Sequence, residues 1–174
     1  DHPPGLERKR VSSENRTDAN RRYGRSGGSP DVDALPHDAL VVYDSLIARP
    51  EISPSRLLVW GHSLGSFLAT HVAAERTVEG LVLENPATNA EDWVDHLFPW
   101  YLRLLFDVEV ADALRAQDNL SRIRGIDVPL LVITGENDRV TDPRMGRRLY
   151  EAANSAYRRL IEVDDGSHNE LYEE

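Results

Sequence analysis

The strongest candidate for chemistry in this 174-residue sequence is Ser63, at the centre of the Gly-His-Ser-Leu-Gly motif of residues 61–65. An apolar run at residues 57–60 precedes the motif and a helical pattern over residues 64–75 follows it. This context predicts a sharp strand-to-helix turn that exposes the serine hydroxyl. Both glycines of the motif are expected to leave room for the bend. At the start of the helix, the backbone N–H of Leu64 is predicted to stabilise an oxyanion, because free N–H groups there favour negative charge.

A serine hydroxyl becomes a good nucleophile only when a base removes its proton. Three histidines follow Ser63, namely His71, His96 and His168. His71 lies two turns along the predicted helix and points away from the serine, and His96 lies in an insertion between two predicted strands. His168 follows the last predicted strand, in the kind of loop where ligands bind to parallel sheets. We therefore predict His168 as the base, with His96 as the weaker alternative.

An acid that orients the base should lie between the serine and the histidine in chain order. The loop after the apolar run at residues 128–134 supplies two candidates, Glu136 and Asp138. Asp164 and Asp165 adjoin the histidine in sequence and are weaker candidates, because solvent would surround them. A serine, a histidine and an acid in this order are expected to attack a carbonyl group and form an acyl-enzyme that water releases.

Four apolar runs alternate with helical patterns, and these elements must position the candidate residues. The predicted strands lie near residues 57–60, 80–84, 128–134 and 159–163, and the predicted helices near residues 31–49, 64–75 and 144–153. Continuous apolar strands separated by helices are typical of an α/β fold with a parallel sheet and helices on both faces.

The sequence predicts one domain over residues 23–174, preceded by an irregular or disordered segment at residues 1–22 that lacks helical or strand periodicity. An aromatic-rich insertion at about residues 88–124 separates the second and third strands. The insertion is interpreted either as a helix packed on the sheet or as a cap over the site, and both interpretations can hold together.

Composition excludes several other classes of function. The sequence has no cysteine, so it offers no disulfide, thiolate metal site or cysteine nucleophile. Its net charge of −10 disfavours nucleic acid and anionic membranes as partners. No apolar stretch has the length of a membrane span or the form of a signal peptide, which predicts a cytoplasmic protein with no indicated membrane contact. The motifs imply neither a cofactor nor a metal.

Four segments together resemble the serine-hydrolase branch of the α/β-hydrolase superfamily, near its monoacylglycerol-lipase-like and lysophospholipase-like members. Residues 23–30 resemble the family's R-G-Y-G-x-S loop, residues 60–65 its nucleophile elbow, residues 135–138 its G-x-x-D acid loop, and residues 166–169 its histidine loop. The resemblance favours Asp138 over Glu136 as the acid. It implies a cofactor-independent hydrolase of a carboxylic ester or related acyl bond in a small molecule. The aromatic insertion suggests that this substrate carries an apolar chain.

The sequence departs from the family before residue 23. The family's H-G loop, which supplies a second oxyanion N–H, has no counterpart beyond residues 2–5, and residues 12–22 lack an apolar strand. We therefore expect an incomplete fold without the N-terminal strands, with the strand at residues 57–60 on an exposed edge.

A missing oxyanion donor lowers the rate roughly 100- to 1000-fold, so weak or absent hydrolysis of short esters is expected from the chain as given. The alternative is a non-catalytic α/β-hydrolase-like scaffold without a complete oxyanion hole. Thioesterases, amidases, peptidases and acyltransferases use the same machinery and remain open.

Overall fold

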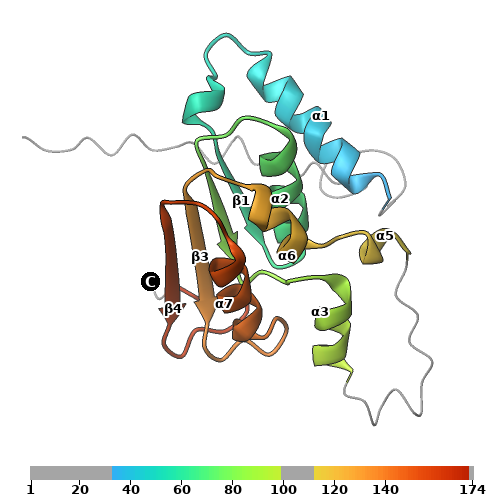
Figure 1. Cartoon of the computed structure of the whole chain (residues 1–174), viewed down its shortest axis with the longest axis vertical. Coiled ribbons are helices and arrows are strands. Elements are labelled where there is room, and N and C mark those ends of the chain that lie inside the picture. The colour runs from blue at the N-terminus through green and yellow to red at the C-terminus, as the bar shows by residue number, and fades with distance from the viewer. Residues whose placement is uncertain (1–32, 99–111, 173–174) are drawn as a thin grey trace, which may run out of the picture. The chain divides into compact units, whose positions relative to one another are not determined.

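The computed structural model describes residues 33–98 and 112–172 (Figure 1). Within these residues, four strands form one sheet in the order β1-β2-β3-β4. The strands are Leu58–His62 (β1), Gly80–Glu84 (β2), Leu130–Gly135 (β3) and Arg158–Val163 (β4). Every neighbouring pair is parallel, which confirms the predicted α/β class. Because all four carboxyl ends lie at one edge, the loops that follow them meet there.

One helix precedes β1 and helices connect each strand to the next, as the alternating pattern predicts. They are Leu35–Ile47 (α1), Gly65–Glu75 (α2), Ala90–Leu97 (α3), Asp112–Arg115 (α5), Asn119–Arg122 (α6) and Pro143–Ala152 (α7). Local signals set their starts. Pro36 lies in the first turn of α1, where its missing N–H removes no helical hydrogen bond. The side chain of Asn89 caps α3 by accepting the Asp92 N–H at 2.7 Å. None of the helices in the described ranges is long and apolar enough to cross a bilayer.

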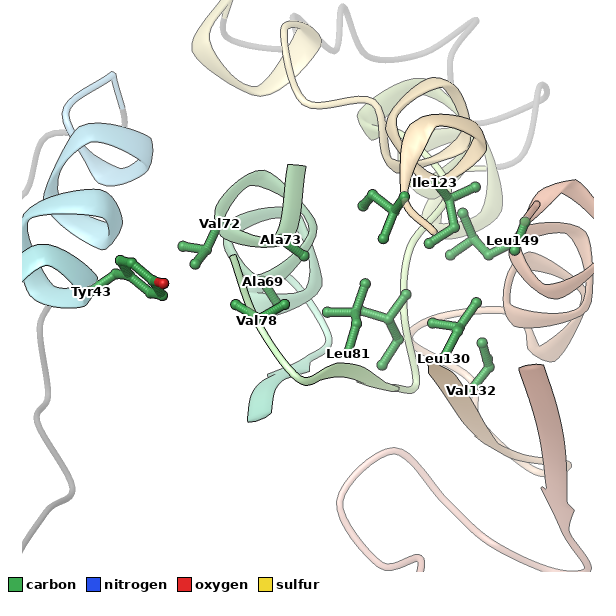
Figure 2. Close-up of a cluster of buried hydrophobic side chains, with 13 residues drawn as sticks. Tyr43, Ala69, Val72, Ala73, Val78, Leu81, Ile123, Leu130, Val132 and Leu149 are labelled. Atoms are coloured by element: carbon green, nitrogen blue, oxygen red, sulfur yellow. The ribbon is translucent and has the colours of Figure 1, made fainter. Parts of the chain in front are cut away.

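One face of the sheet carries the largest hydrophobic core (Figure 2). Side chains from α2 and α7 pack against alternate residues of the central strands, and the main contributors are Ala69, Val72, Ala73, Leu81, Leu83, Leu130, Val132 and Leu149. Burying each valine or leucine among them contributes about 1.5–3 kcal/mol. This packing fixes α2, and therefore the turn that precedes it, against β1 and β2.

The opposite face of the sheet is also apolar. Leu58 and Trp60 of β1 point to it and remain 64% and 59% exposed, while Val82 and Leu131 are half-buried. In the described part of the chain β1 is the outermost strand beside β2, in agreement with the expected edge position.

Several predictions concern segments outside the described residues. These are the irregular segment at residues 1–22, the R-G-Y-G-x-S-like loop at residues 23–30, the H-G remnant at residues 2–5 and the central aromatics of the insertion at residues 99–111. The described parts of the insertion are α3, α5 and α6. They are consistent with the helical interpretation of the insertion.

Candidate active site

Ser63 lies in the tight turn between β1 and α2. Its φ of 53° is in the left-handed region, which non-glycine residues seldom adopt and which recurs at functional turns. The Ser63 N–H donates to the Glu84 carbonyl at 2.9 Å, tying the turn to the end of β2. A Cβ on Gly61 would lie 2.5 Å from the Gly65 carbonyl oxygen and 2.6 Å from the Ala69 Cβ, so this position requires glycine.

The second glycine of the motif has a different environment from the one we expected. A Cβ added to Gly65 would meet no atom within 4 Å among the described residues. The expectation that both glycines relieve a collision is therefore correct for Gly61 and wrong for Gly65. The difference arises because Ser66 and Ala69 of α2 pack against Gly61, whereas a Cβ on Gly65, the first residue of that helix, would meet open space among the described residues.

The structure brings three of the sequence-predicted residues together in one hydrogen-bonded chain. Ser63 Oγ lies 2.9 Å from His168 Nε2, and His168 Nδ1 lies 2.7 Å from Asp138 Oδ2. The alternative base is elsewhere: His96 Nε2 contacts the Arg139 carbonyl at 3.1 Å. The geometry therefore favours His168 over His96 as the partner of Ser63.

Asp138 sits in the loop after β3 with its side chain fully buried. One carboxylate oxygen accepts the N–H groups of Val140 at 2.7 Å and Thr141 at 3.0 Å, and the other accepts the Thr141 hydroxyl at 2.7 Å. These donors fix the carboxylate so that Oδ2 also faces the imidazole. The competing acids Glu136, Asp164 and Asp165 are exposed to solvent, and Asp165 Oδ1 accepts from Asn137 Nδ2 at 3.2 Å.

The acid loop and the histidine loop approach each other closely at their backbones. A Cβ on Gly135 would lie 2.4 Å from the Gly166 carbonyl oxygen. The same carbonyl accepts the Asn137 N–H at 2.9 Å. The first position of the G-x-x-D segment therefore requires glycine, because any Cβ there would prevent the loops after β3 and β4 from packing together.

Two residues that the sequence analysis did not single out hold the His168 backbone. His62 Nε2 lies 2.8 Å from the His168 carbonyl oxygen, and the two imidazole rings pack at 4.9 Å between centroids with a 46° tilt. Asn85 Nδ2 donates to the same carbonyl at 2.9 Å. Both residues stand at the carboxyl ends of apolar strands, which is the sequence signal that could have identified them.

The first helix of the insertion contacts the acid loop. Trp93 Nε1 donates to the Val140 carbonyl at 3.0 Å, and His96 contacts the neighbouring Arg139 carbonyl. Arg148 of α7 bonds Asp92 at 2.7 Å and fixes the start of α3. Helix α3 thus packs beside the loop that carries Asp138.

The N–H of Leu64 is the predicted oxyanion donor. Leu64 precedes the first residue of α2, and no acceptor for its N–H occurs among the residues that the structure describes. Such unpaired N–H groups are usual at the start of a helix and favour an anion there. Within the described ranges, no three His, Asp or Glu side chains are arranged to hold a metal ion.

The sequence of the chain has relatives among known proteins. The family model described as the prolyl oligopeptidase family matches residues 21–164. The human protein ABHD12B is 35% identical over 153 residues, which cover 79% of this chain and 41% of the relative. The lysophosphatidylserine lipase ABHD12 of Danio rerio is 34% identical over 145 residues, which cover 76% and 37%. The chain thus spans about two fifths of the length of these curated relatives.

The fold has counterparts among solved structures. The monoacylglycerol lipase of Paleococcus ferrophilus superimposes with a TM-score of 0.60 at 22% sequence identity, covering 83% of this chain and 71% of the lipase. This likeness confirms the predicted α/β-hydrolase fold. The chain belongs to the prolyl oligopeptidase family and, through it, to the serine-hydrolase branch of the α/β-hydrolase superfamily.

Proposed function

We propose that the protein hydrolyses a carboxylic ester or related acyl bond, with Ser63 as the nucleophile, His168 as the general base and Asp138 as the orienting acid. The observation that carries this proposal is the hydrogen-bonded chain of these three side chains, at 2.9 and 2.7 Å. A reactive serine needs a base within hydrogen-bond reach and a third group that orients the base. At the carboxyl edge of the sheet, His168 lies within hydrogen-bond reach of Ser63 and Asp138 lies within reach of His168.

In the proposed mechanism, Ser63 Oγ attacks the carbonyl carbon of the substrate while His168 Nε2 accepts the hydroxyl proton. Asp138 accepts the Nδ1–H of His168, which selects the tautomer with a free Nε2 and stabilises the imidazolium. His168 then gives its proton to the leaving alcohol, and an acyl-enzyme remains. Water deprotonated by His168 attacks this ester, and return of the proton to Ser63 Oγ releases the acid.

The oxyanion that forms on the carbonyl oxygen is proposed to accept a hydrogen bond from the Leu64 N–H. This donor is fixed by the turn between β1 and α2, so it needs no reorganisation when charge develops. One such donor is worth roughly 100- to 1000-fold in rate.

For the substrate, we propose a small lipid-like ester with an apolar acyl chain, for which neither a cofactor nor a metal is needed. The relatives support this class, since they include lysophosphatidylserine lipases. The exposed side chains of Leu64 and Phe98, 40% and 38% accessible, offer apolar surface on the elbow and at the end of α3. The name of the matched family makes peptides the competing class.

Labelling with a fluorophosphonate probe tests the nucleophile directly. Ser63 Oγ should displace fluoride from phosphorus, and intact-mass analysis should show one adduct that is absent in Ser63→Ala. His71→Gln is a matched control, because it alters a histidine that lies on α2 rather than in the hydrogen-bonded chain. An adduct that persists in Ser63→Ala would contradict the proposal, and complete absence of labelling would favour the non-catalytic scaffold.

The substrate class can be tested on the same samples. p-Nitrophenyl esters of increasing acyl length should be hydrolysed faster as the chain lengthens, whereas an acyl-peptide anilide should be hydrolysed slowly. Faster cleavage of the anilide would favour a peptidase and overturn the proposed ester substrate, while leaving the role of Ser63 intact.

A further inference from the structure

Asn85 is a buried polar residue that the proposed mechanism does not use. It is 2% exposed and directly follows β2. Its φ of 42° lies in the left-handed region, which asparagine tolerates better than most residues. A buried amide costs free energy unless its donors and acceptors are paired, so its bonding partners indicate what the residue does.

The side chain of Asn85 bonds the loops after both β3 and β4. Its Oδ1 accepts the N–H of Gly135 at 2.9 Å, at the end of β3. Its Nδ2 donates to the carbonyls of His168 at 2.9 Å and Ser167 at 3.3 Å. The orientation of the amide is unambiguous, because one end faces an N–H group and the other faces two carbonyl groups.

The backbone of Asn85 extends the same network to the acid. The Thr141 hydroxyl lies 2.9 Å from the Asn85 carbonyl oxygen and 2.7 Å from Asp138 Oδ2, and its single proton can be donated to either oxygen. The Asn85 N–H donates to the Ile133 carbonyl at 2.8 Å. One residue therefore links the end of β2 to the acid loop and the histidine loop.

Few residue types could serve at this position. It requires a side chain that tolerates the left-handed conformation and presents one acceptor and one donor at short reach. Aspartate has the shape but lacks the donor, and glycine has the conformational freedom but lacks the amide.

We propose that Asn85 is a positioning residue that sets the His168 imidazole between Ser63 and Asp138 by fixing the backbone of the histidine loop. The inference rests on the proposed function for its kinetic consequence, but its structural claim concerns only the His168–Asp138 hydrogen bond. His62 supports the same carbonyl from the end of β1. Displacement of a catalytic group by about 1 Å can lower a rate roughly 100-fold.

The test compares Asn85→Asp with Asn119→Asp. Asn119 is also fully buried and pairs both ends of its amide, accepting from Thr70 and donating to Ser66 Oγ at 3.0 Å and the Ala87 carbonyl at 2.8 Å. The same isosteric change therefore removes a comparable buried donor, but away from the histidine loop. Any effect common to both variants reports stability rather than positioning.

The first readout is the proton resonance of the His168 Nδ1–H in the full chain, assigned by its loss in His168→Gln. This resonance should disappear or move upfield in Asn85→Asp and persist in Asn119→Asp. The second readout is the pH profile of fluorophosphonate labelling, in which Asn85→Asp should react roughly 10- to 100-fold more slowly with a displaced profile. Asn119→Asp should keep the wild-type profile.

An unchanged resonance and profile in folded Asn85→Asp would overturn the positioning role, as would equal changes in both variants. If Asn85→Asp does not fold, Asn85→Gly removes the amide without steric strain at the left-handed φ and must give the same spectral change. Failure of the proposed function has a different result: wild-type protein would show the Nδ1–H resonance without Ser63-dependent labelling.

Discussion

The nucleophile and its base are held in place by different kinds of interaction. Ser63 is positioned by the backbone, through a left-handed turn, a bond to the Glu84 carbonyl and a glycine whose Cβ would collide with α2. His168 is positioned by side chains from other parts of the sequence, since Asn85 and His62 hold its carbonyl. The turn is therefore encoded locally, whereas the place of the imidazole depends on contacts more than 80 residues apart in sequence.

This difference predicts that substitutions at the Ser63 turn and substitutions around the histidine loop have different effects. Steric change at the turn should cost stability first, because it disturbs the packing of α2 on the sheet. Loss of a hydrogen bond on the histidine side should cost reactivity first, because the loops can stay folded while the imidazole moves.

The largest effect is expected from Asp138→Asn on the histidine side. An amide in place of the carboxylate can present N–H to His168 Nδ1 and select the wrong tautomer, so labelling at Ser63 should slow by roughly 10⁴-fold. Stability should change much less, because Oδ1 can still accept the N–H groups of Val140 and Thr141. The rate of fluorophosphonate labelling and a urea titration measure the two effects.

Asp165→Asn is the matched control for this substitution. Asp165 has a left-handed φ of 58°, which asparagine tolerates. Its labelling rate should equal that of the wild type. A rate for Asp138→Asn within tenfold of the wild type would show that Asp138 does not orient the base.

The second effect concerns the turn. Gly61→Ala places a methyl group 2.5–2.7 Å from atoms of Gly65, Ser66 and Ala69, and overpacking of this kind costs about 1–3 kcal/mol. Gly65→Ala meets open space among the described residues, so its free energy of unfolding should stay within about 1 kcal/mol of the wild type. Urea denaturation of both variants compares them. Equal losses would contradict the assignment of the steric constraint to Gly61 alone.

The contrast between local and long-range interactions also explains which features could be predicted from the sequence. The four strands and the elbow follow from local patterns of apolar residues and glycine, and the structure agrees to within about two residues at each strand end. The histidine was chosen from chain order and strand position, which are long-range but follow the topology. That Ser63, His168 and Asp138 adjoin one another agrees with the choice, and their catalytic roles remain predictions.

The contacts of Asn85 and His62 were not predicted, because nothing in their local sequence indicates which carbonyl they face. Gly65 shows the opposite error. Its place in the motif predicts that a Cβ there would collide with the turn. Whether a collision occurs depends on the position of α2 relative to the turn, which the motif does not contain. Both errors concern tertiary distances, which periodicity and spacing do not contain.

A smaller effect is expected at the contact between α3 and the acid loop. Trp93→Phe removes the N–H that bonds the Val140 carbonyl. In a urea titration this should lower the free energy of unfolding by about 1 kcal/mol. Labelling should slow less than tenfold, since Asp138 keeps its own donors. Tyr157→Phe is the control, because that ring is 78% exposed and its change should be within about 0.5 kcal/mol. If Trp93→Phe lowers the free energy of unfolding no more than Tyr157→Phe does, α3 does not stabilise the acid loop.

The smallest effect concerns His71, on the helix that follows Ser63. Burial lowers the pKa of His71, and the neighbouring Arg122 lowers the pKa further. The unfolded chain therefore takes up a proton more readily than the folded protein, so stability should fall as pH drops through the ordinary histidine pKa and level off below the folded value. His71→Gln should flatten this part of the dependence between about pH 8 and pH 5.

The pH dependence of labelling should be unchanged in His71→Gln, because His71 lies on α2 and does not belong to the hydrogen-bonded chain of Ser63, His168 and Asp138. Urea titrations and labelling rates at the same pH values separate the two. A change in the labelling profile would mean that the charge on His71 affects the reactivity of Ser63, and the contrast between the turn and the histidine loop would fail.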